Sequence, residues 1–332
     1  MKHNLDTQLL VCFLEKQGEF ISGGALAKKF DISRVSIWSH LEKLRKEGFE
    51  FDAVQNRGYS LASVPDVLQG SLLKAYLQRC DCAMPVFFHE VVDSTNTEAE
   101  RQIAAGLDVP FAVVAKKMTA GRGRLGRSWQ SDNPGSLYLT FGFKPRLAPQ
   151  AMQCFSLWMG INFCRFIKNY TGLAVSIKWP NDIVIQGKKI AGMLAEARID
   201  ADYTRDMIFG VGININGPLA RFPKELQDKA TTLEVESGHP FPINHFAARF
   251  IQCGYHAYQA FVENPNPPEL FDLWNEYDFL RGKSVTATTR TDAFSGTVSG
   301  IDENGHLLLD LGDGSVKKLS AADVSLSSSY QA

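Results

Sequence analysis

The order of local patterns in the N-terminal part of the chain constrains the fold most. Residues 8–17 repeat apolar side chains at helical spacing. Ser22 and Ser33 each stand directly before a helix-forming run, which is the usual position of an N-cap. Two strand patterns follow, at 49–54 and 58–62, with a short polar turn between them. Three helices and a hairpin in this order predict a winged helix-turn-helix.

The helix predicted after Ser33 is the one that such a module lays in the major groove of DNA. Its apolar residues Ile37, Leu41 and Leu44 recur at spacings of four and three, so we expect the other positions to face solvent. Residues 28–46 hold six basic and two acidic side chains, whereas the whole chain has a net charge of −1, so a DNA surface must be local. A helical protein–protein module with a hairpin is the alternative. The expected DNA-contacting residues are Ser22, Ser33, Arg34, Ser36, Ser39, His40, Lys43, Asn56 and Arg57.

A polar cluster follows the next strand pattern. Residues 85–92 are predicted to form a buried strand, and the sequence Asp93-Ser94-Thr95-Asn96 comes directly after it. Hydroxyl and amide groups both donate and accept hydrogen bonds, so the cluster suits a neutral polar ring such as a ureido or amide group. The same residues would also cap a following helix, and a plain N-cap without a ligand is the alternative.

Residues 119–129 form a loop rich in glycine and arginine. Three of its glycines satisfy GxGxxG, but the loop leads into a Pro/Gly turn and a strand rather than a helix, which excludes a Rossmann turn. Residues 116–127 carry five positive charges and no acidic side chain. Guanidinium groups on such a backbone can bind phosphate and carboxylate together. We assign Gly121, Arg122, Gly123 and Arg124 to an anion site.

Three later positions point to the same chemistry. Lys189 lies on a predicted strand beside Gly192, where an ammonium group can contact a phosphate and the glycine admits a ligand close to the backbone. Asn214 ends another glycine-containing strand pattern. The region from 282 onward turns to short strands with Gly/Asp turns, which predicts a small SH3-like barrel.

The motifs DSTN, GRGRLGR, KWPND, KKIAG and GVGININ, in this order, resemble those of the biotin–protein ligases. With the N-terminal module, the chain resembles the bifunctional members that are also repressors of the biotin operon. The resemblance covers essentially the whole chain. It implies an α+β protein with a winged helix-turn-helix at 1–64, a central mixed-sheet, class II synthetase-like catalytic domain at 65–279 and a small SH3-like β-barrel at 280–332.

The resemblance implies an activity in two steps. The carboxylate of biotin attacks the α-phosphate of Mg-ATP to give biotinyl-5′-AMP, and a lysine of the biotin carboxyl carrier protein of acetyl-CoA carboxylase then takes the biotin. It also implies a repressor that binds biotin operator DNA, with biotinyl-AMP as corepressor, as a homodimer when the adenylate is bound. A ligase whose DNA head no longer regulates is one alternative. A lipoate or octanoyl ligase is another, which GRGR with KWPND and the lack of a clear cysteine nucleophile disfavour.

The resemblance also implies residue roles. Ser94 and Thr95 would hold the head of biotin, Lys189 would contact its carboxylate and the α-phosphate, and Asn214 would contact the nucleotide. Asp182 would bind Mg²⁺ through water or help to deprotonate the incoming lysine, and the sequence does not decide between the two. The expected catalytic residues are Lys189, Arg122, Arg124 and Asp182, without a site for a resident metal. The expected ligand site comprises Ser94, Thr95, Asn96, Met118, Gly121, Arg122, Gly123, Arg124, Lys189, Gly192 and Asn214.

Two positions depart from the family pattern. Met118 stands where family members usually carry glutamine, and a thioether is at best a weak acceptor. We therefore expect somewhat weaker biotin binding and no change of ligand. Ser327 stands where the family has a late arginine, which puts a C-terminal ATP contact in doubt.

The six cysteines form no disulfide framework and no CxxC pair, which favours reduced thiols in a reducing compartment. The N-terminus lacks the apolar run of a signal peptide, and the most apolar stretch, 152–164, is too short to cross a bilayer. The sequence therefore predicts a cytoplasmic protein without a membrane partner.

Overall fold

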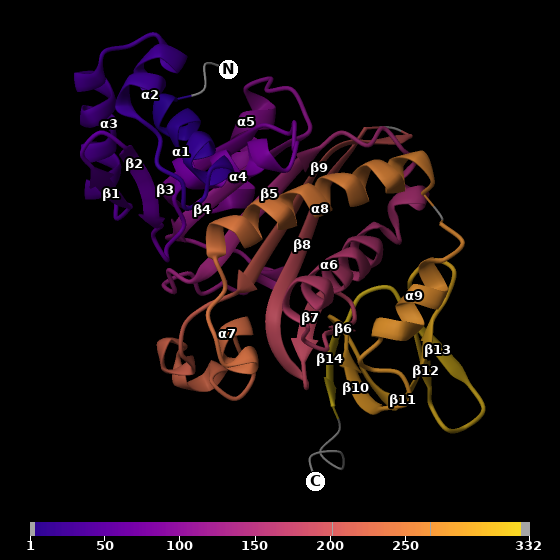
Figure 1. Ribbon diagram of the computed structural model, residues 1–332. Coiled ribbons are helices and arrows are strands. Elements are labelled where there is room, and N and C mark those ends of the chain that lie inside the picture. The colour runs from indigo at the N-terminus through magenta and orange to yellow at the C-terminus, as the bar shows by residue number, and fades with distance from the viewer. Residues whose placement is uncertain (1–3, 201, 266, 327–332) are drawn as a thin grey trace. The chain divides into compact units, whose positions relative to one another are not determined.

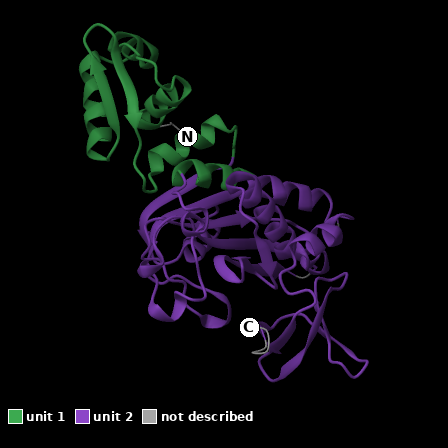
Figure 2. Ribbon diagram, turned by 60° about the horizontal axis from the view of Figure 1, so that its bottom comes forward, with its two compact units in different colours: residues 1–83, 242–252 green, residues 84–241, 253–332 purple. Residues whose placement is uncertain are grey.

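The computed structural model describes residues 4–200, 202–265 and 267–326. The chain divides into two compact units, residues 1–83 with 242–252 and residues 84–241 with 253–332 (Figure 2). The expected α+β class is confirmed, with a helix-turn-helix head, a mixed central sheet and a C-terminal antiparallel sheet.

Unit 1 contains the three helices and the hairpin that the sequence predicts. Ser22 and Ser33 are N-caps whose hydroxyl oxygens accept hydrogen bonds from the amides of Ala25 and Ser36. The first helix begins at Leu5, earlier than the expected start at residue 8. The elements are α1 (Leu5–Glu15), α2 (Gly23–Phe30), α3 (Arg34–Lys46), β1 (Glu50–Val54), β2 (Gly58–Ser63) and α4 (Gly70–Arg79).

The core of unit 1 joins all of these elements. Leu9 and Phe13 of α1 pack in one apolar cluster with Ile37 of α3. Leu72 and Ala75 of α4 belong to the same cluster, so the helix after the linker packs with the helix-turn-helix. The strands β1 and β2 pair antiparallel across the expected wing turn.

Unit 2 is built on a seven-stranded sheet in the order β3-β4-β5-β9-β8-β7-β6 (Figure 1). The strands β3 and β4 run parallel, and the remaining neighbours pair antiparallel, which makes the sheet mixed. The strands are β3 (Val86–Val92), β4 (Phe111–Met118), β5 (Ser136–Phe143), β6 (Ser176–Lys178), β7 (Asp182–Ile185), β8 (Lys188–Asp200) and β9 (Tyr203–Asn214).

Alternation along β5 assigns the two faces of this sheet. Phe141 and Phe143 stack against aromatic rings of α6 and α8, whereas Thr140 points to the opposite face and bonds to the start of α5. The polar face therefore lies on the α5 side. The helices are α5 (Thr95–Ala104), α6 (Phe155–Thr171), α7 (Leu233–Ser237), α8 (Ile243–Glu263) and α9 (Leu270–Tyr277), with 3₁₀ turns η1 (Arg124–Gly126), η2 (Pro149–Met152), η3 (Leu219–Arg221) and η4 (Lys224–Leu226). The part of α8 up to Gln252 belongs to unit 1.

The C-terminal part of unit 2 is a five-stranded antiparallel sheet in the order β13-β12-β11-β10-β14. This confirms a small β module in that region. The expected departure at Ser327 lies outside the described residues. Within the described ranges, no helix combines the length and apolar character needed to cross a membrane. The strands are β10 (Ser284–Thr288), β11 (Ala293–Ile301), β12 (Leu307–Asp310), β13 (Val316–Leu319) and β14 (Asp323–Leu326).

Candidate functional site

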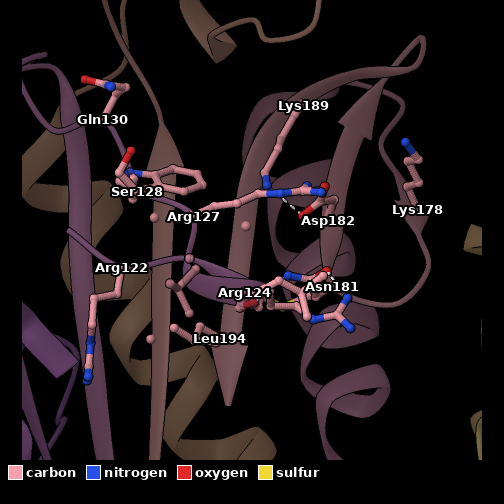
Figure 3. Close-up of a pocket in the computed structure, with 18 of the residues that line it drawn as sticks. Arg122, Arg124, Arg127, Ser128, Gln130, Lys178, Asn181, Asp182, Lys189 and Leu194 are labelled. Atoms are coloured by element: carbon pink, nitrogen blue, oxygen red, sulfur yellow. Dashed lines mark hydrogen bonds and ion pairs between the residues drawn. The ribbon is translucent and has the colours of Figure 1, made fainter. Parts of the chain in front are cut away.

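A cavity of about 510 Å³ opens in unit 2 on the polar side of the central sheet (Figure 3). This volume is in the range of pockets that hold small molecules and cofactors. Of the residues that the sequence assigned to the ligand site and its chemistry, Gly121 does not line the cavity. Its carbonyl instead accepts from the amide of Trp129, which closes the arginine loop. The expected residues that do line it are Ser94, Thr95, Asn96, Met118, Arg122, Gly123, Arg124, Asp182, Lys189, Gly192 and Asn214.

Two facing glycines form part of the cavity floor. Gly192 on β8 pairs with Gly212 on β9. A Cβ at these positions would lie 2.7 and 2.4 Å from the ring of Trp129, so only glycine lets the indole lie against the sheet. The Nε1 of Trp129 is buried and has no hydrogen-bond partner among the described protein atoms.

Lys189 and Asp182 meet inside the cavity. The Lys189 Nζ lies 2.7 Å from Asp182 Oδ1 and 5.1 Å from the centroid of the Trp129 ring. The lysine is held at the start of β8, where its amide donates to Lys229 and its carbonyl accepts from Thr231. A partly buried ammonium beside a carboxylate and an aromatic face is fixed in position and suits an anionic group.

The three loop arginines each have a different partner. Arg124 donates to Asn181 Oδ1 at 3.1 Å, and its burial lowers the pKa of the guanidinium below the usual value. Arg127 pairs with Asp323 of β14, and this pair lowers the pKa of the aspartate. The loop is thereby tied to two different parts of unit 2.

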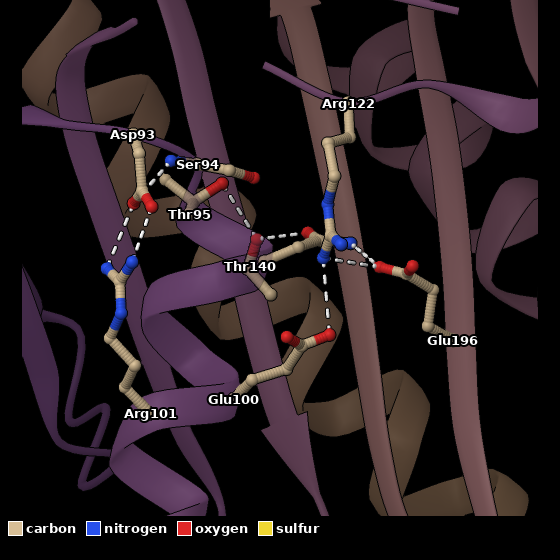
Figure 4. Close-up of polar contacts among 9 residues, drawn as sticks. Asp93, Ser94, Thr95, Glu100, Arg101, Arg122, Thr140 and Glu196 are labelled. Atoms are coloured by element: carbon tan, nitrogen blue, oxygen red, sulfur yellow. Dashed lines mark hydrogen bonds and ion pairs between the residues drawn. The ribbon is translucent and has the colours of Figure 1, made fainter. Parts of the chain in front are cut away.

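The Arg122 side chain points away from the Lys189–Asp182 pair (Figure 3) and toward Glu100 and Glu196 (Figure 4). Its NH2 lies 3.2 Å from Glu100 and 3.1 Å from Glu196. The Arg122 side chain is 39% exposed, so this is a solvent-accessible contact. In this conformation the side chain forms ion pairs with two carboxylates of the protein.

The polar cluster after β3 meets the cavity at the start of α5. Ser94 occupies the N-cap position, but its side chain makes no capping hydrogen bond, which disfavours the plain-cap interpretation. Thr95 donates its amide to the sulfur of Met118 at 3.5 Å, and its hydroxyl lies 3.6 Å from the same atom. Thr140 Oγ1 donates to Asn96 Oδ1 at 2.7 Å and lies 2.8 Å from the hydroxyl oxygen of Thr95 (Figure 4). Met118 is therefore a buried acceptor for Thr95.

Two of the expected DNA contacts are turned toward the protein. His40 Nδ1 lies 2.6 Å and Lys43 Nζ 2.5 Å from the carboxylate of Asp6, whose side chain is 1% exposed. Burial raises the pKa of Asp6, but hydrogen bonds from Lys43 and His40 outweigh it and hold that pKa below its usual value. The pair thus ties α3 to α1, a role that the sequence analysis missed.

The other expected DNA contacts lie at the helix starts and on the wing. Arg34 and Ser39 are exposed on α3, and Asn56 and Arg57 are exposed at the wing turn. Asn56 adopts a φ of 62°, which the turn requires, and the Arg57 guanidinium lies 4.4 Å from the ring centroid of Phe20. Ser22, Ser33 and Ser36 take part in the two capping bonds described above.

Sequence reasoning missed several residues of the cavity. Trp129 is the last residue of the arginine loop, and Asn181 belongs to the KWPND motif, so both carried a usable signal. The acidic partners Glu100, Glu196 and Asp323 carried none, because they reach the loop from distant segments.

Three family models match the chain. The biotin/lipoate A/B protein ligase family matches residues 88–214, an HTH domain matches 6–60, and a biotin protein ligase C-terminal domain matches 281–327. A solved biotin protein ligase from Aquifex aeolicus, in complex with biotin and ATP, shares 28% sequence identity with a TM-score of 0.62. It covers 73% of this chain and 98% of that one.

Curated relatives extend over the full length. The bifunctional ligase/repressor BirA of Bacillus subtilis is 33% identical over 326 residues, which cover 98% of this chain and 100% of the relative. The Escherichia coli BirA is 30% identical over 328 residues, with 99% of each chain covered. Fold and site define a ligase catalytic domain joined to a helix-turn-helix head. The chain belongs to the biotin/lipoate A/B protein ligase family, in its bifunctional ligase/repressor branch, which confirms the resemblance of the motifs.

Proposed function

We propose that this chain uses ATP to activate biotin as biotinyl-5′-AMP and transfers the biotin to a lysine of the biotin carboxyl carrier protein of acetyl-CoA carboxylase. The observation that carries the proposal is that Lys189, Arg124 and Asp182 line one cavity, which the Trp129 ring also lines. An apolar wall suits the body of biotin, and fixed cations suit the carboxylate and phosphates.

In the first step a carboxylate oxygen of biotin attacks the α-phosphorus of ATP, and pyrophosphate leaves. In the second step the uncharged amine of the carrier lysine attacks the acyl carbon of the mixed anhydride, and AMP leaves with the electron pair of the broken bond. Such chemistry requires alignment and charge stabilisation more than a protein nucleophile. Lys189 supplies a positive charge at the α-phosphate, and Arg124 does so along the phosphates.

ATP is proposed to bind with Mg²⁺, and the cavity fits this ion. Magnesium in ATP sites is held by one or two carboxylates together with the substrate phosphates. The carboxylate of Asp182 lines the cavity beside Lys189 and can hold the ion through water. When bound, the ion would neutralise charge on the phosphates. Asp182 has a second open role, which is to accept the proton of the carrier lysine. Its place in the cavity suits this role as well.

The assignment of the site residues is part of this proposal. Ser94, Thr95 and Asn96 are proposed to meet the ring of biotin, with Met118 behind them. Arg122 is proposed to leave its carboxylates and fold over the adenylate together with Gly121 and Gly123. The nucleotide would lie by Gly192 and Asn214.

The head is proposed to repress biotin synthesis by binding operator DNA, with biotinyl-AMP as corepressor. The support is the helix-turn-helix of unit 1 with its exposed Arg34, Ser39 and Arg57. We further propose a homodimer when the adenylate is bound, since a two-fold protein matches a symmetric operator. The proposed domains are 1–64, 65–279 and 280–332, and the proposed compartment is the cytoplasm.

A labelling assay tests the ligase function. The purified chain is incubated with MgATP, biotin and a carrier domain, and biotinylated lysine is detected by mass spectrometry; lipoate replaces biotin in a parallel reaction. Biotinylation without lipoylation is expected, whereas lipoylation alone would favour the lipoate-ligase alternative. Lys189→Ala should abolish adenylate formation. Lys188→Ala is the control and should retain it, because successive side chains of a strand point to opposite faces of the sheet.

A gel shift tests the repressor function. DNA from upstream of biotin-synthesis genes is titrated with the protein, with and without biotin and ATP. Tighter binding with both ligands is expected, and Arg57→Ala should weaken binding to every DNA and reduce the salt dependence by about one charge. No shift in either condition would favour a ligase whose head does not regulate.

A further inference from the structure

Two large apolar side chains of α3 are exposed within one helical turn. Val35 is 74% and Trp38 is 52% exposed. Residues three apart on a helix are neighbours, so the two side chains form one apolar strip. A single exposed apolar residue is ordinary, but a valine and a tryptophan side by side near the start of one helix indicate a binding surface.

The direction of the strip follows from the buried residues of the same helix. Ile37, Leu41 and Leu44 are fully buried and define the inward face of α3. At about 100° per residue, Val35 lies roughly 200° from Ile37, and Trp38 lies roughly 100° from it. The strip therefore covers the outward face and one flank of α3.

The opposite flank of α3 is already occupied. His40 and Lys43, expected from the sequence to contact DNA, bind Asp6 of α1. The flank that carries Trp38 also carries Arg45, which donates to the carbonyl of Phe51 on β1 at 3.1 Å. Trp38 thus lies on the side of α3 that faces the winged hairpin.

Basic residues surround the strip. Arg34 precedes Val35 and is exposed, and Lys46 is exposed at the far end of the helix. A protein–protein interface is usually depleted of charge at its apolar core. A duplex presents apolar groups and phosphates together, because the 5-methyl group of thymine lies in a major groove that two phosphate backbones border.

We propose that Val35 and Trp38 read thymine 5-methyl groups in the major groove of the operator. The proposal rests on the DNA-binding function proposed above and adds the base that the head selects. In helix-turn-helix proteins the N-terminal residues of the recognition helix contact base edges. Val35 is the second residue and Trp38 the fifth residue of α3. Arg34 and Lys46 hold the phosphates on either side.

The test removes single methyl groups from the DNA. A binding sequence is first selected from a random duplex pool with the full-length protein, biotin and MgATP. Each thymine is then replaced in turn by deoxyuridine, which lacks only the 5-methyl group, and the Kd is measured by fluorescence anisotropy. At one or more positions we expect binding about fourfold weaker, the ratio that follows from burial of one methyl group.

The variants connect the methyl group to the side chain. The Trp38→Ala protein should bind the thymine and uracil duplexes equally tightly at the position that Trp38 contacts in the wild type. The Val35→Ala protein should do so at the position that Val35 contacts. Val235→Ala is the matched control, because Val235 is 42% exposed in unit 2 and should leave the thymine preference unchanged. Since the substituted side chains are exposed, unchanged biotinylation rates and thermal unfolding would show intact folding.

Three results would overturn the proposal in distinguishable ways. If the wild type binds every uracil duplex as tightly as the thymine duplex, no methyl group is read. A thymine preference that persists in both α3 variants would assign the reading to other residues. A protein that enriches no sequence at all would refute the DNA-binding function itself, and this inference with it.

Discussion

Removal of the negative charges of Glu100 and Glu196 should make the enzyme hold its adenylate longer. Both carboxylates pair with the NH2 of Arg122, at 3.2 and 3.1 Å (Figure 4). In the proposed function Arg122 must leave them to fold over the adenylate, so the two acids compete with the ligand. Glu100→Gln/Glu196→Gln retains the shape of both side chains, and the amide oxygen at position 196 can still accept from Asn96.

The magnitude follows from the exposure of the partners. Arg122, Glu100 and Glu196 are 39%, 31% and 36% exposed, so water and salt screen both pairs. Exposed pairs contribute about 0.5 kcal/mol each. Loss of both therefore shifts the equilibrium by about 1 kcal/mol, or roughly fivefold. The difference should shrink in 0.5 M NaCl, where the Debye length is only a few ångströms.

The assay follows release of biotinyl-AMP. Labelled adenylate is formed on the enzyme without a carrier, unlabelled biotinyl-AMP is added in excess, and the bound label is measured with time. The double variant should release the adenylate roughly fivefold more slowly than the wild type. Glu276→Gln is the matched control, because it removes an exposed ion pair with Lys168 at 3.0 Å. Release at the wild-type rate or faster in the double variant would refute competition by these acids.

Three further outcomes are expected. Met118→Gln should bind biotin about fivefold more tightly by isothermal titration, because an amide gives a hydrogen bond of order 1 kcal/mol that a thioether cannot match; unchanged or poorer affinity would contradict this. Gly212→Ala should weaken biotin binding at least tenfold with a small fall in Tm, since its Cβ would lie 2.4 Å from the Trp129 ring and displace it; wild-type affinity would show that the ring position does not matter. Asp6→Asn should destabilise the head by about 1–3 kcal/mol at pH 7, as measured by urea unfolding followed by circular dichroism. The folded state lowers the pKa of Asp6 below 3.8, so the charged carboxylate stabilises the head above that pH. The difference in unfolding free energy between wild type and variant should therefore vanish as the pH falls through the lowered pKa. A constant difference down to pH 2 would argue against the charge as its source.

Features that depend on residues close together in the chain could be predicted from the sequence. The caps at Ser22 and Ser33 indicated where two helices begin, and the strand predicted at Lys189 is β8 of the structure. The glycine at 192 was expected to allow a close approach to the backbone. The structure shows that the approaching group is the Trp129 ring, which joins the site through a loop about sixty residues earlier in the chain.

Features that depend on distant partners could not be predicted. His40 and Lys43 were expected to face DNA because the helical pattern of α3 leaves them polar and unassigned. Their partner Asp6 lies 34 and 37 residues away, at the start of a helix that was expected to begin at residue 8. Trp38, by contrast, was among the positions of this helix that were expected to face solvent, and it is 52% exposed.

One oxygen of Glu196 connects two parts of the site that the sequence presented as separate motifs. Its Oε2 accepts from Asn96 Nδ2 at 2.6 Å and from Arg122 NH2 at 3.1 Å. The Asn96 amide in turn lies against Gly210 of β9, where a Cβ would come within 2.2 Å of its oxygen. Asn96 is thus fixed by the sheet and by Glu196, whereas the Arg122 side chain is held at half-buried carboxylates that water reaches. A ligand that draws Arg122 inward therefore leaves Glu196 bound to Asn96, so the loop can change position while the polar cluster that is proposed to meet biotin keeps its geometry.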